Sequence, residues 1–185
     1  GEPVAVVSVT RTGILDNRLE FYRRNCARIP SVTGAVIPEP VFTRADYERD
    51  ILERIYRDLA PYDPDGVLQD EWANARGTIA RFDRSALEIR VLDVQECPRA
   101  DVAIAACITH VLRALVSELT CSFAEQKRWP VESLAALFRR CVRDADRTPI
   151  DDARYLAVFG IGSTAGIRTV GELWQRLAES FVWTA

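Results

Sequence analysis

Histidine and paired cysteines are almost absent from this sequence. His110 is the only histidine of the 185 residues, and none of the five cysteines belongs to a Cys-x-x-Cys pair. Zinc sites built on several histidines or on cysteine pairs are therefore excluded. An odd number of cysteines also argues against a disulfide framework, so we interpret them as reduced thiols of a cytoplasmic protein. His110 lies in a long apolar segment, which favours a place in the core or at its boundary over the base of a Ser–His–Asp triad.

Long apolar runs and an excess of positive charge are lacking as well. No run approaches the ~18 apolar residues of a membrane-spanning helix. The formal net charge is −3, which gives no general attraction to nucleic acid. With 48% hydrophobic and 28% charged residues, the composition is that of a globular domain with a core. We therefore expect no membrane or nucleic-acid partner.

Methionine is missing altogether, and the chain begins with Gly1. The first residues lack the basic and apolar regions of a signal peptide. The valine-rich stretch Val4 to Thr10 predicts a strand at the very start. We therefore expect a fragment of a longer protein that forms one domain over residues 1–185. Residues 1–98 would supply the strand, a hairpin and the site-lining segments, and residues 99–185 would be helical.

The most informative stretch is a charged strand. Residues Ala86 to Val94 alternate as a strand does, which places Glu88 and Arg90 on one face. The run Ile79 to Phe82 predicts a second short strand, with Asp83-Arg84-Ser85 as the turn between them. A carboxylate and a guanidinium on one strand face form a solvated or cross-strand ion pair, or they line a site.

Helical patterns surround this hairpin. The segment Ala100 to Phe123 is apolar around most of its circumference, which predicts a mostly buried helix. Other helices are expected from Asp16, from Thr43 to Pro61, from a first turn that contains Pro130, and from the capping box Thr169-x-x-Glu172. In the second of these helices, Tyr47, Ile51 and Ile55 follow helical spacing and form the apolar face. The predicted fold is α+β, with a small antiparallel sheet made from the first strand and the hairpin and packed by several α-helices.

An arginine-rich run precedes the hairpin and includes Arg18 and Arg28. Its side chains could form a solvated basic face paired with Glu20. The alternative is an anion pocket, because guanidinium groups bind phosphate and carboxylate in a bidentate manner. The sequence alone leaves both open.

A long irregular stretch, Pro61 to Gly77, leads into the hairpin and ends with Trp72, Asn74 and Arg76 close together. Loops of this length inside a compact domain are often functional. We therefore expect it to line or cover the site, the alternative being a simple linker.

At this point a family resemblance becomes visible. The run Arg-Phe-Asp-Arg-Ser-Ala-Leu-Glu-Ile-Arg-Val-Leu-Asp-Val-Gln-Glu-Cys-Pro, which ends at Pro98, resembles the C-terminal signature of the type 2 glutamate–cysteine ligases, also called carboxylate–amine ligases. The runs Gly13 to Tyr22 and Thr33 to Pro40 fit the same family. The resemblance implies the C-terminal part of a glutamine-synthetase-like fold. It also implies an ATP- and Mg²⁺-dependent enzyme of glutathione biosynthesis that joins the γ-carboxylate of glutamate to an amine, by default cysteine, through an acyl phosphate.

The resemblance also implies roles for the hairpin residues. Glu88 is expected to bind Mg²⁺ and Arg90 to contact phosphate or a substrate carboxylate. The strand rise separates them by roughly 6.6 Å, which an ion and its phosphate can bridge. Glutamine synthetase is similar at this strand but has an arginine where this chain has Ala86. Arg84 or Arg81, across the hairpin, is expected to substitute.

The complete expected site follows from these arguments. Catalytic roles go to Arg90 and Arg84, the metal to Glu88, and substrate or nucleotide binding to Arg18, Arg28, Arg76, Arg81, Trp72 and Asn74. The expected ligands are Mg²⁺, ATP, glutamate and an amine. No second acidic cluster is visible, so other metal ligands are expected in an N-terminal part of the same protein, and this chain alone is expected to be inactive.

A rival interpretation is a non-catalytic partner-binding domain derived from a ligase fold. Ala86 and the lack of a second acidic cluster leave room for it. Association of copies into a homo-oligomer also stays open.

Overall fold

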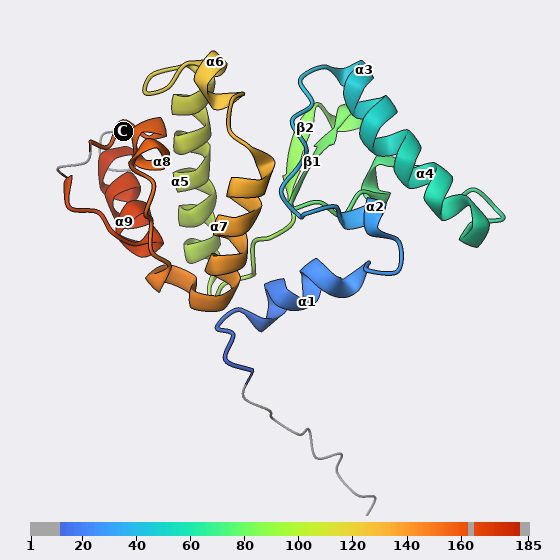
Figure 1. Cartoon of the computed structure of the whole chain (residues 1–185), viewed down its shortest axis with the longest axis horizontal. Coiled ribbons are helices and arrows are strands. Elements are labelled where there is room, and N and C mark those ends of the chain that lie inside the picture. The colour runs from blue at the N-terminus through green and yellow to red at the C-terminus, as the bar shows by residue number, and fades with distance from the viewer. Residues whose placement is uncertain (1–11, 163–164, 182–185) are drawn as a thin grey trace, which may run out of the picture.

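The structure is a computed structural model that describes residues 12–162 and 165–181. Its elements in chain order are α1 (Asn17–Asn25), α2 (Pro30–Thr33), α3 (Arg44–Tyr47), α4 (Glu53–Leu59), β1 (Thr78–Arg81), β2 (Ala86–Ile89), α5 (Pro98–Val116), α6 (Phe123–Gln126), α7 (Val131–Asp144), α8 (Ala153–Val158) and α9 (Val170–Phe181) (Figure 1). A two-stranded antiparallel sheet with several helices confirms the predicted α+β class. The expected strand Val4–Thr10 lies outside the described residues.

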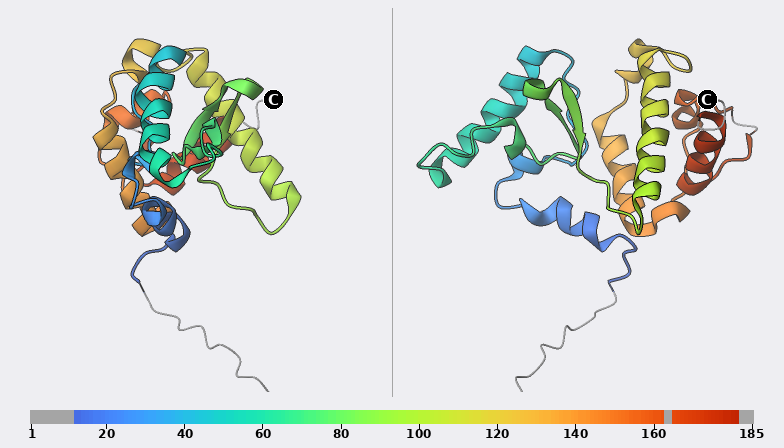
Figure 2. Two further views of the ribbon diagram at one scale, coloured as in Figure 1. Left: turned by 90° about the vertical axis from the view of Figure 1, so that its right-hand side faces the viewer. Right: turned by 180° about the vertical axis from the view of Figure 1, so that it is seen from behind.

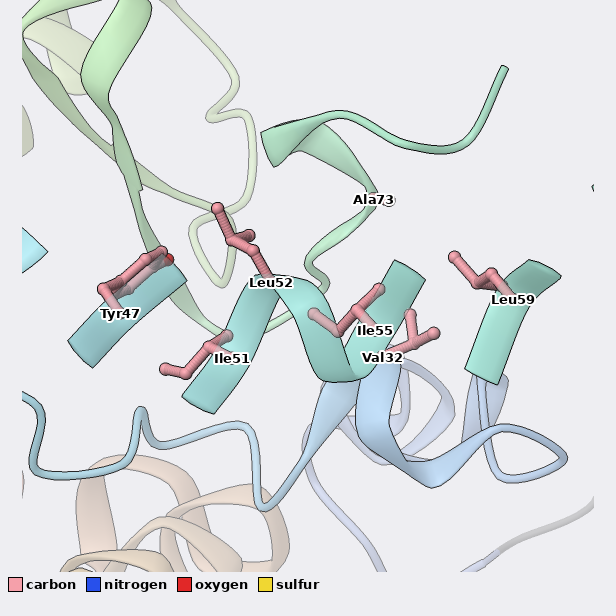
Figure 3. Packing of buried hydrophobic residues seen from close by; sticks show 7 residues of the cluster. All are labelled: Val32, Tyr47, Ile51, Leu52, Ile55, Leu59 and Ala73. Carbon is pink, nitrogen blue, oxygen red and sulfur yellow. The ribbon is translucent and has the colours of Figure 1, made fainter. Parts of the chain in front are cut away.

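The helix predicted from Thr43 forms the centre of the first core. The Thr43 hydroxyl accepts a hydrogen bond from the Asp46 backbone at 3.1 Å and caps α3, as its sequence pattern predicts. A π-helical turn, Glu48–Leu52, joins α3 to α4. The buried face packs with α2 and the loop before β1 in a cluster drawn in Figure 3: Val32, Tyr47, Ile51, Leu52, Ile55, Leu59 and Ala73.

The hairpin is shorter than predicted. β2 ends at Ile89 instead of Val94, because β1 begins only at Thr78 and offers no partner further on. One last ladder bond joins the Arg90 amide to the Gly77 carbonyl at 2.8 Å. Ser85, with φ of 49°, takes the left-handed conformation that closes the turn.

The prediction of a mostly buried helix over Ala100 to Phe123 is wrong. The helix ends at Val116, because Glu118 turns the chain with φ of 52°. Of its side chains only Val111 and Ala114 are buried, whereas Val102 is 69% exposed. The second core contacts one side of α5, and within the part of the chain that the structure describes nothing covers the opposite side.

The second core lies among the C-terminal helices, beside the part that holds the hairpin (Figures 1 and 2). Its buried members come from α5, α8, α9 and the connection after α8: Val111, Leu156, Ile161, Leu173 and Leu177. The predicted capping box at α9 is confirmed, since the Thr169 hydroxyl accepts from the Glu172 amide at 3.2 Å and the Glu172 carboxylate accepts from the Thr169 amide at 3.1 Å. Pro130 directly precedes α7 instead of lying in its first turn.

Helix α1 connects the two parts. Asp16 caps it by accepting from the Leu19 amide at 2.8 Å, which agrees with the predicted start. Just before the helix, the Leu15 amide donates to the Arg143 carbonyl at the end of α7, at 3.0 Å. The arginine-rich helix is thereby held under the hairpin (Figure 1).

Candidate functional site

The hairpin register gathers three charged side chains on one face. Ile79 pairs with Glu88 and Arg81 pairs with Ala86, so Arg81 and Glu88 lie on the same side of the sheet. Arg81 Nη1 donates to Glu88 Oε2 at 3.0 Å. Directly after β2, Arg90 Nε donates to Glu88 Oε1 at 2.8 Å. Glu88 is therefore held between two guanidinium groups, one from each side.

The register distinguishes the two arginines that were expected to substitute for an arginine at the position of Ala86. Arg81 is the direct cross-strand neighbour of Ala86 and reaches Glu88, and it is nearly buried. Arg84, in the turn, is exposed and pairs with Asp83 at 3.3 Å. Of the two candidates, Arg81 is the one that the fold brings to Glu88, and the catalytic role assigned to Arg84 stays a prediction.

These contacts keep Glu88 ionised. Partial burial opposes its charge, but hydrogen bonds from Arg81 and Arg90 outweigh that effect and hold the pKa of Glu88 below its usual range. The carboxylate is thus a permanent anion near neutral pH. Its side chain keeps 38% exposure, so it remains open to solvent and to a ligand.

Arg81 also binds acidic residues of the turn and of the preceding loop. Its Nε lies 3.3 Å from Asp83 Oδ1 and 3.4 Å from Glu71 Oε2. Partial burial opposes the charge of Asp83, but hydrogen bonds with Glu71 and Arg81 lower its pKa on balance. Glu71 Oε2 is buried without a hydrogen bond that meets normal geometry. Excess negative charge thus surrounds Arg81, and Glu71 belongs to the long loop that was expected to line or cover the site.

Arg90 ties the long loop to the hairpin. Its Nη1 donates to the carbonyl oxygens of Trp72 and Asn74 at 3.0 and 2.8 Å. Trp72 and Asn74 therefore lie beside the charged cluster, as expected for a loop that lines a site. The partly exposed Trp72 ring is available for contact.

Arg76 and Asn74 are built into the scaffold. Arg76 is 2% exposed and donates to the Glu39 carboxylate, to the Ser31 carbonyl and to Asn74 Oδ1. The Asn74 amide donates to the Tyr47 hydroxyl at 2.8 Å, deep in the first core. Because all three guanidinium nitrogens of Arg76 already have protein acceptors, its assignment to ligand binding stays a prediction without a free donor to support it.

Tyr22 is a site residue that the sequence analysis did not assign. Its hydroxyl donates to the Arg76 carbonyl at 3.3 Å, and burial raises its pKa although the nearby charge of Arg90 opposes the shift. Its spacing from Arg18 on α1 could have indicated that both side chains point to the hairpin.

The two remaining arginines differ in position. Arg18 donates to the Val91 carbonyl at 2.7 Å and pairs with Asp93 at 3.2 Å, so it reaches the segment that follows β2. Arg28 is exposed and lies over the Tyr62 ring, 5.4 Å from its centroid. No described contact joins Arg28 to Glu88, and its role in substrate binding stays a prediction.

A metal-binding cluster and a membrane-spanning helix are both absent from the described residues. No group of three or more His, Cys, Asp or Glu side chains is arranged to hold a metal ion. No helix in residues 12–162 and 165–181 has the length and apolarity needed to cross a membrane.

Comparison with known proteins agrees with these observations. A protein of Archaeoglobus fulgidus described as uncharacterized is 46% identical over 108 residues, which are 57% of this chain and 28% of that protein. The chain thus spans little more than a quarter of the relative's length. No solved structure matches the chain. The family model of glutamate-cysteine ligase family 2 matches residues 7–176, and because this range includes nearly the whole chain, the protein belongs to that family.

Proposed function

We propose that the protein containing this chain is an ATP-dependent carboxylate–amine ligase. It joins the γ-carboxylate of glutamate to an amine, with cysteine as the first candidate, through an acyl phosphate. The observation that carries the proposal is the placement of Glu88 between Arg81 and Arg90 on an accessible face of the hairpin. Family membership supports the reaction class.

The arginines suit the charge changes of this reaction. Phosphoryl transfer to a carboxylate concentrates negative charge on the transferred group, and positioned guanidinium groups stabilise it. Arg90 has its Nε and Nη1 fixed by Glu88 and by the loop carbonyls, so its orientation is set before a substrate arrives. Arg81 is oriented in the same way by Glu88 and Asp83.

Glu88 provides a partial magnesium site. Mg²⁺ prefers carboxylate oxygens and keeps several waters, and it would neutralise phosphate charge when bound. A single ionised, half-exposed carboxylate fits one position in such a shell. The described residues supply no three-carboxylate group, so the other ligands in this proposal come from elsewhere in the full-length protein.

Product formation by the full-length protein tests the reaction. The protein is incubated with ATP, Mg²⁺, glutamate and either cysteine or one of a panel of other amines, and γ-glutamyl products are identified by mass spectrometry. A γ-glutamyl amide that requires ATP supports the proposal and identifies the acceptor. Absence of any such product from folded protein that binds ATP contradicts it.

A second candidate function is a partner-binding module without turnover. One observation favours it: Val102 and Val116 of α5 point away from the second core and are more than half exposed. Such a surface is typical of a face that another polypeptide covers. A folded protein that makes no product but binds a protein partner through α5 would favour this candidate.

A further inference from the structure

A separate cavity lies in the helical part of the molecule. It has a volume of about 500 Å³ and is formed where the connection after α5, the end of α6 and helix α8 meet. Ligand pockets of proteins have volumes of roughly 300–1,000 Å³. The cavity shares no lining residue with the cluster around Glu88, so its role does not depend on the proposed ligase reaction.

Hydrogen bonds hold the walls of this cavity in place. The Thr120 hydroxyl donates to the Val158 carbonyl at 2.7 Å, which ties the connection after α5 to the end of α8. Gly160 packs so tightly there that a Cβ atom would lie 2.9 Å from Thr120 Cγ2. The Gln126 amide donates to the Cys121 carbonyl at 2.8 Å. The cavity is thus present before any ligand binds.

Two arginines and one carboxylate supply the charges of the cavity lining. No salt bridge joins Arg128 to a carboxylate of the described residues, although its charge, after the hydrogen bonds from Ser122, helps to lower the pKa of Glu125. Arg154 pairs with Asp152 and lies 5.8 Å from the centroid of the Trp129 ring. The lining carboxylate, Glu125, is already used as the capping box of α6, where it accepts from the amide and the hydroxyl of Ser122. Among the described residues, the Arg128 guanidinium group therefore has no direct protein acceptor and can donate to a ligand.

The rest of the lining is apolar or neutral. The Trp129 ring and the side chains of Pro130 and Val158 contribute the apolar surface. Burial, and after it the charge of Glu125, raises the pKa of the Cys121 thiol, which keeps this side chain uncharged. A molecule that fills the cavity can thus bury an apolar body against Trp129 while its charge contacts Arg128.

We propose that this cavity binds a small carboxylate with an aromatic or other apolar body. A carboxylate matches one guanidinium in a bidentate manner, whereas a phosphate dianion would need further donors. The apolar body is recognised by Trp129 and Val158. The helical part would then bind a small metabolite at a site separate from the cluster around Glu88.

Cys121 provides a local measurement in the full-length protein. We would follow alkylation of Cys121 by iodoacetamide with peptide mass spectrometry at about pH 9, where enough thiolate forms despite the raised pKa. The reaction is run in the presence of phenylacetate, its neutral isostere phenylacetamide, or inorganic phosphate. The exposed Cys97 is the internal control. Phenylacetate should slow alkylation of Cys121 several-fold in a saturable manner and leave Cys97 unchanged, and the other two compounds should protect much less.

Two variants identify the recognising group. Arg128→Gln should raise the phenylacetate concentration for half-protection about tenfold, the loss expected for one charge-assisted contact. The matched control Arg139→Gln, on an exposed position of α7, should leave it unchanged. Three results would overturn the proposal: no protection by phenylacetate up to about 10 mM, equal protection by the amide or by phosphate, or unchanged protection in Arg128→Gln.

Discussion

The two parts of this chain differ in the kinds of side chain that they bury. The part with the hairpin buries guanidinium groups, Arg76 and Arg81, next to its apolar cluster. The helical part buries apolar side chains and leaves its ion pairs, such as Arg143–Asp144, at the surface. Burying a charged pair costs desolvation energy that its attraction often fails to recover. The burial of Arg81 is therefore better explained by the fixed geometry that it gives to Glu88 than by stability.

The parts also differ in what they leave exposed. Around the hairpin, polar and charged groups of the site face solvent, as Glu88 and Trp72 do. In the helical part the exposed surface includes apolar side chains of α5, with Val102 69% and Val116 65% exposed. The charged face around Glu88 is the surface that we propose contacts small ligands, whereas the apolar side of α5 is the surface that a polypeptide would cover in the second candidate function.

The largest expected effect concerns the buried guanidinium of the first part. Arg76→Leu removes the partner of Glu39 and the hydrogen bonds to Ser31 and Asn74, so we expect the free energy of unfolding to fall by about 3–5 kcal/mol. The exposed arginine control Arg139→Leu should change it by no more than about 0.5 kcal/mol. Urea denaturation measures both. A loss below about 1 kcal/mol for Arg76→Leu would show that this network does not support the fold.

The apolar counterpart in the second part is Leu177, which is 2% exposed. Leu177→Ala should cost about 2–5 kcal/mol, because the transfer free energy is lost and a cavity remains. Ile55→Ala, in the first core, should cost a similar amount. If each substitution shifts a different unfolding transition in calorimetry, the two cores are independent units, whereas a common shift means that they unfold together.

A smaller effect on the free energy of unfolding is expected from a change in pH. Burial opposes the charge of Glu39, but the hydrogen bond and charge of Arg76 lower its pKa below the unfolded value. The contribution of Glu39 is therefore present above its unfolded pKa and is lost as pH falls through the folded one. Between about pH 5 and pH 3, the free energy of unfolding should fall less steeply in Glu39→Gln than in the unsubstituted protein. Equal slopes in urea titrations, with Glu53→Gln as control, would contradict this assignment.

The smallest effect belongs to a helix cap. Thr169→Ala removes the hydroxyl that caps α9 and should cost about 1 kcal/mol. The cap of α3, Thr43, is geometrically similar, and Thr43→Ala should cost about the same. Thermal denaturation of both variants measures whether the two parts tolerate the loss of a cap equally.

Local signals in the sequence were sufficient for most elements. Side chains at Thr43 and Thr169 cap the helices they were expected to start, and the spacing of Tyr47, Ile51 and Ile55 correctly predicts the buried face. These features depend on residues three or four positions apart. The helix α5 was mispredicted because an apolar sequence does not reveal whether a partner exists to cover each side.

The site was predictable only in part. The alternation of β2 indicates that Glu88 and Arg90 share a face, and that is found. The choice between Arg81 and Arg84 depends on cross-strand register, which the turn at Ser85 sets and which the sequence leaves open. Arg76 and Glu39, which form an ion pair, are 37 positions apart in the sequence. No local pattern predicts such a contact.

The most direct test of the central claim is phosphate release from ATP by the full-length protein with Glu88→Gln beside Glu53→Gln. Mg²⁺, glutamate and the accepted amine are present, and circular dichroism confirms that both variants are folded. If Glu88 works with Arg81 and Arg90 at the reacting groups, substrate-dependent release falls by at least about 100-fold in Glu88→Gln. Release in Glu53→Gln stays at the level of the unsubstituted protein. Equal release from folded Glu88→Gln and Glu53→Gln would contradict the assignment of this hairpin to the active site.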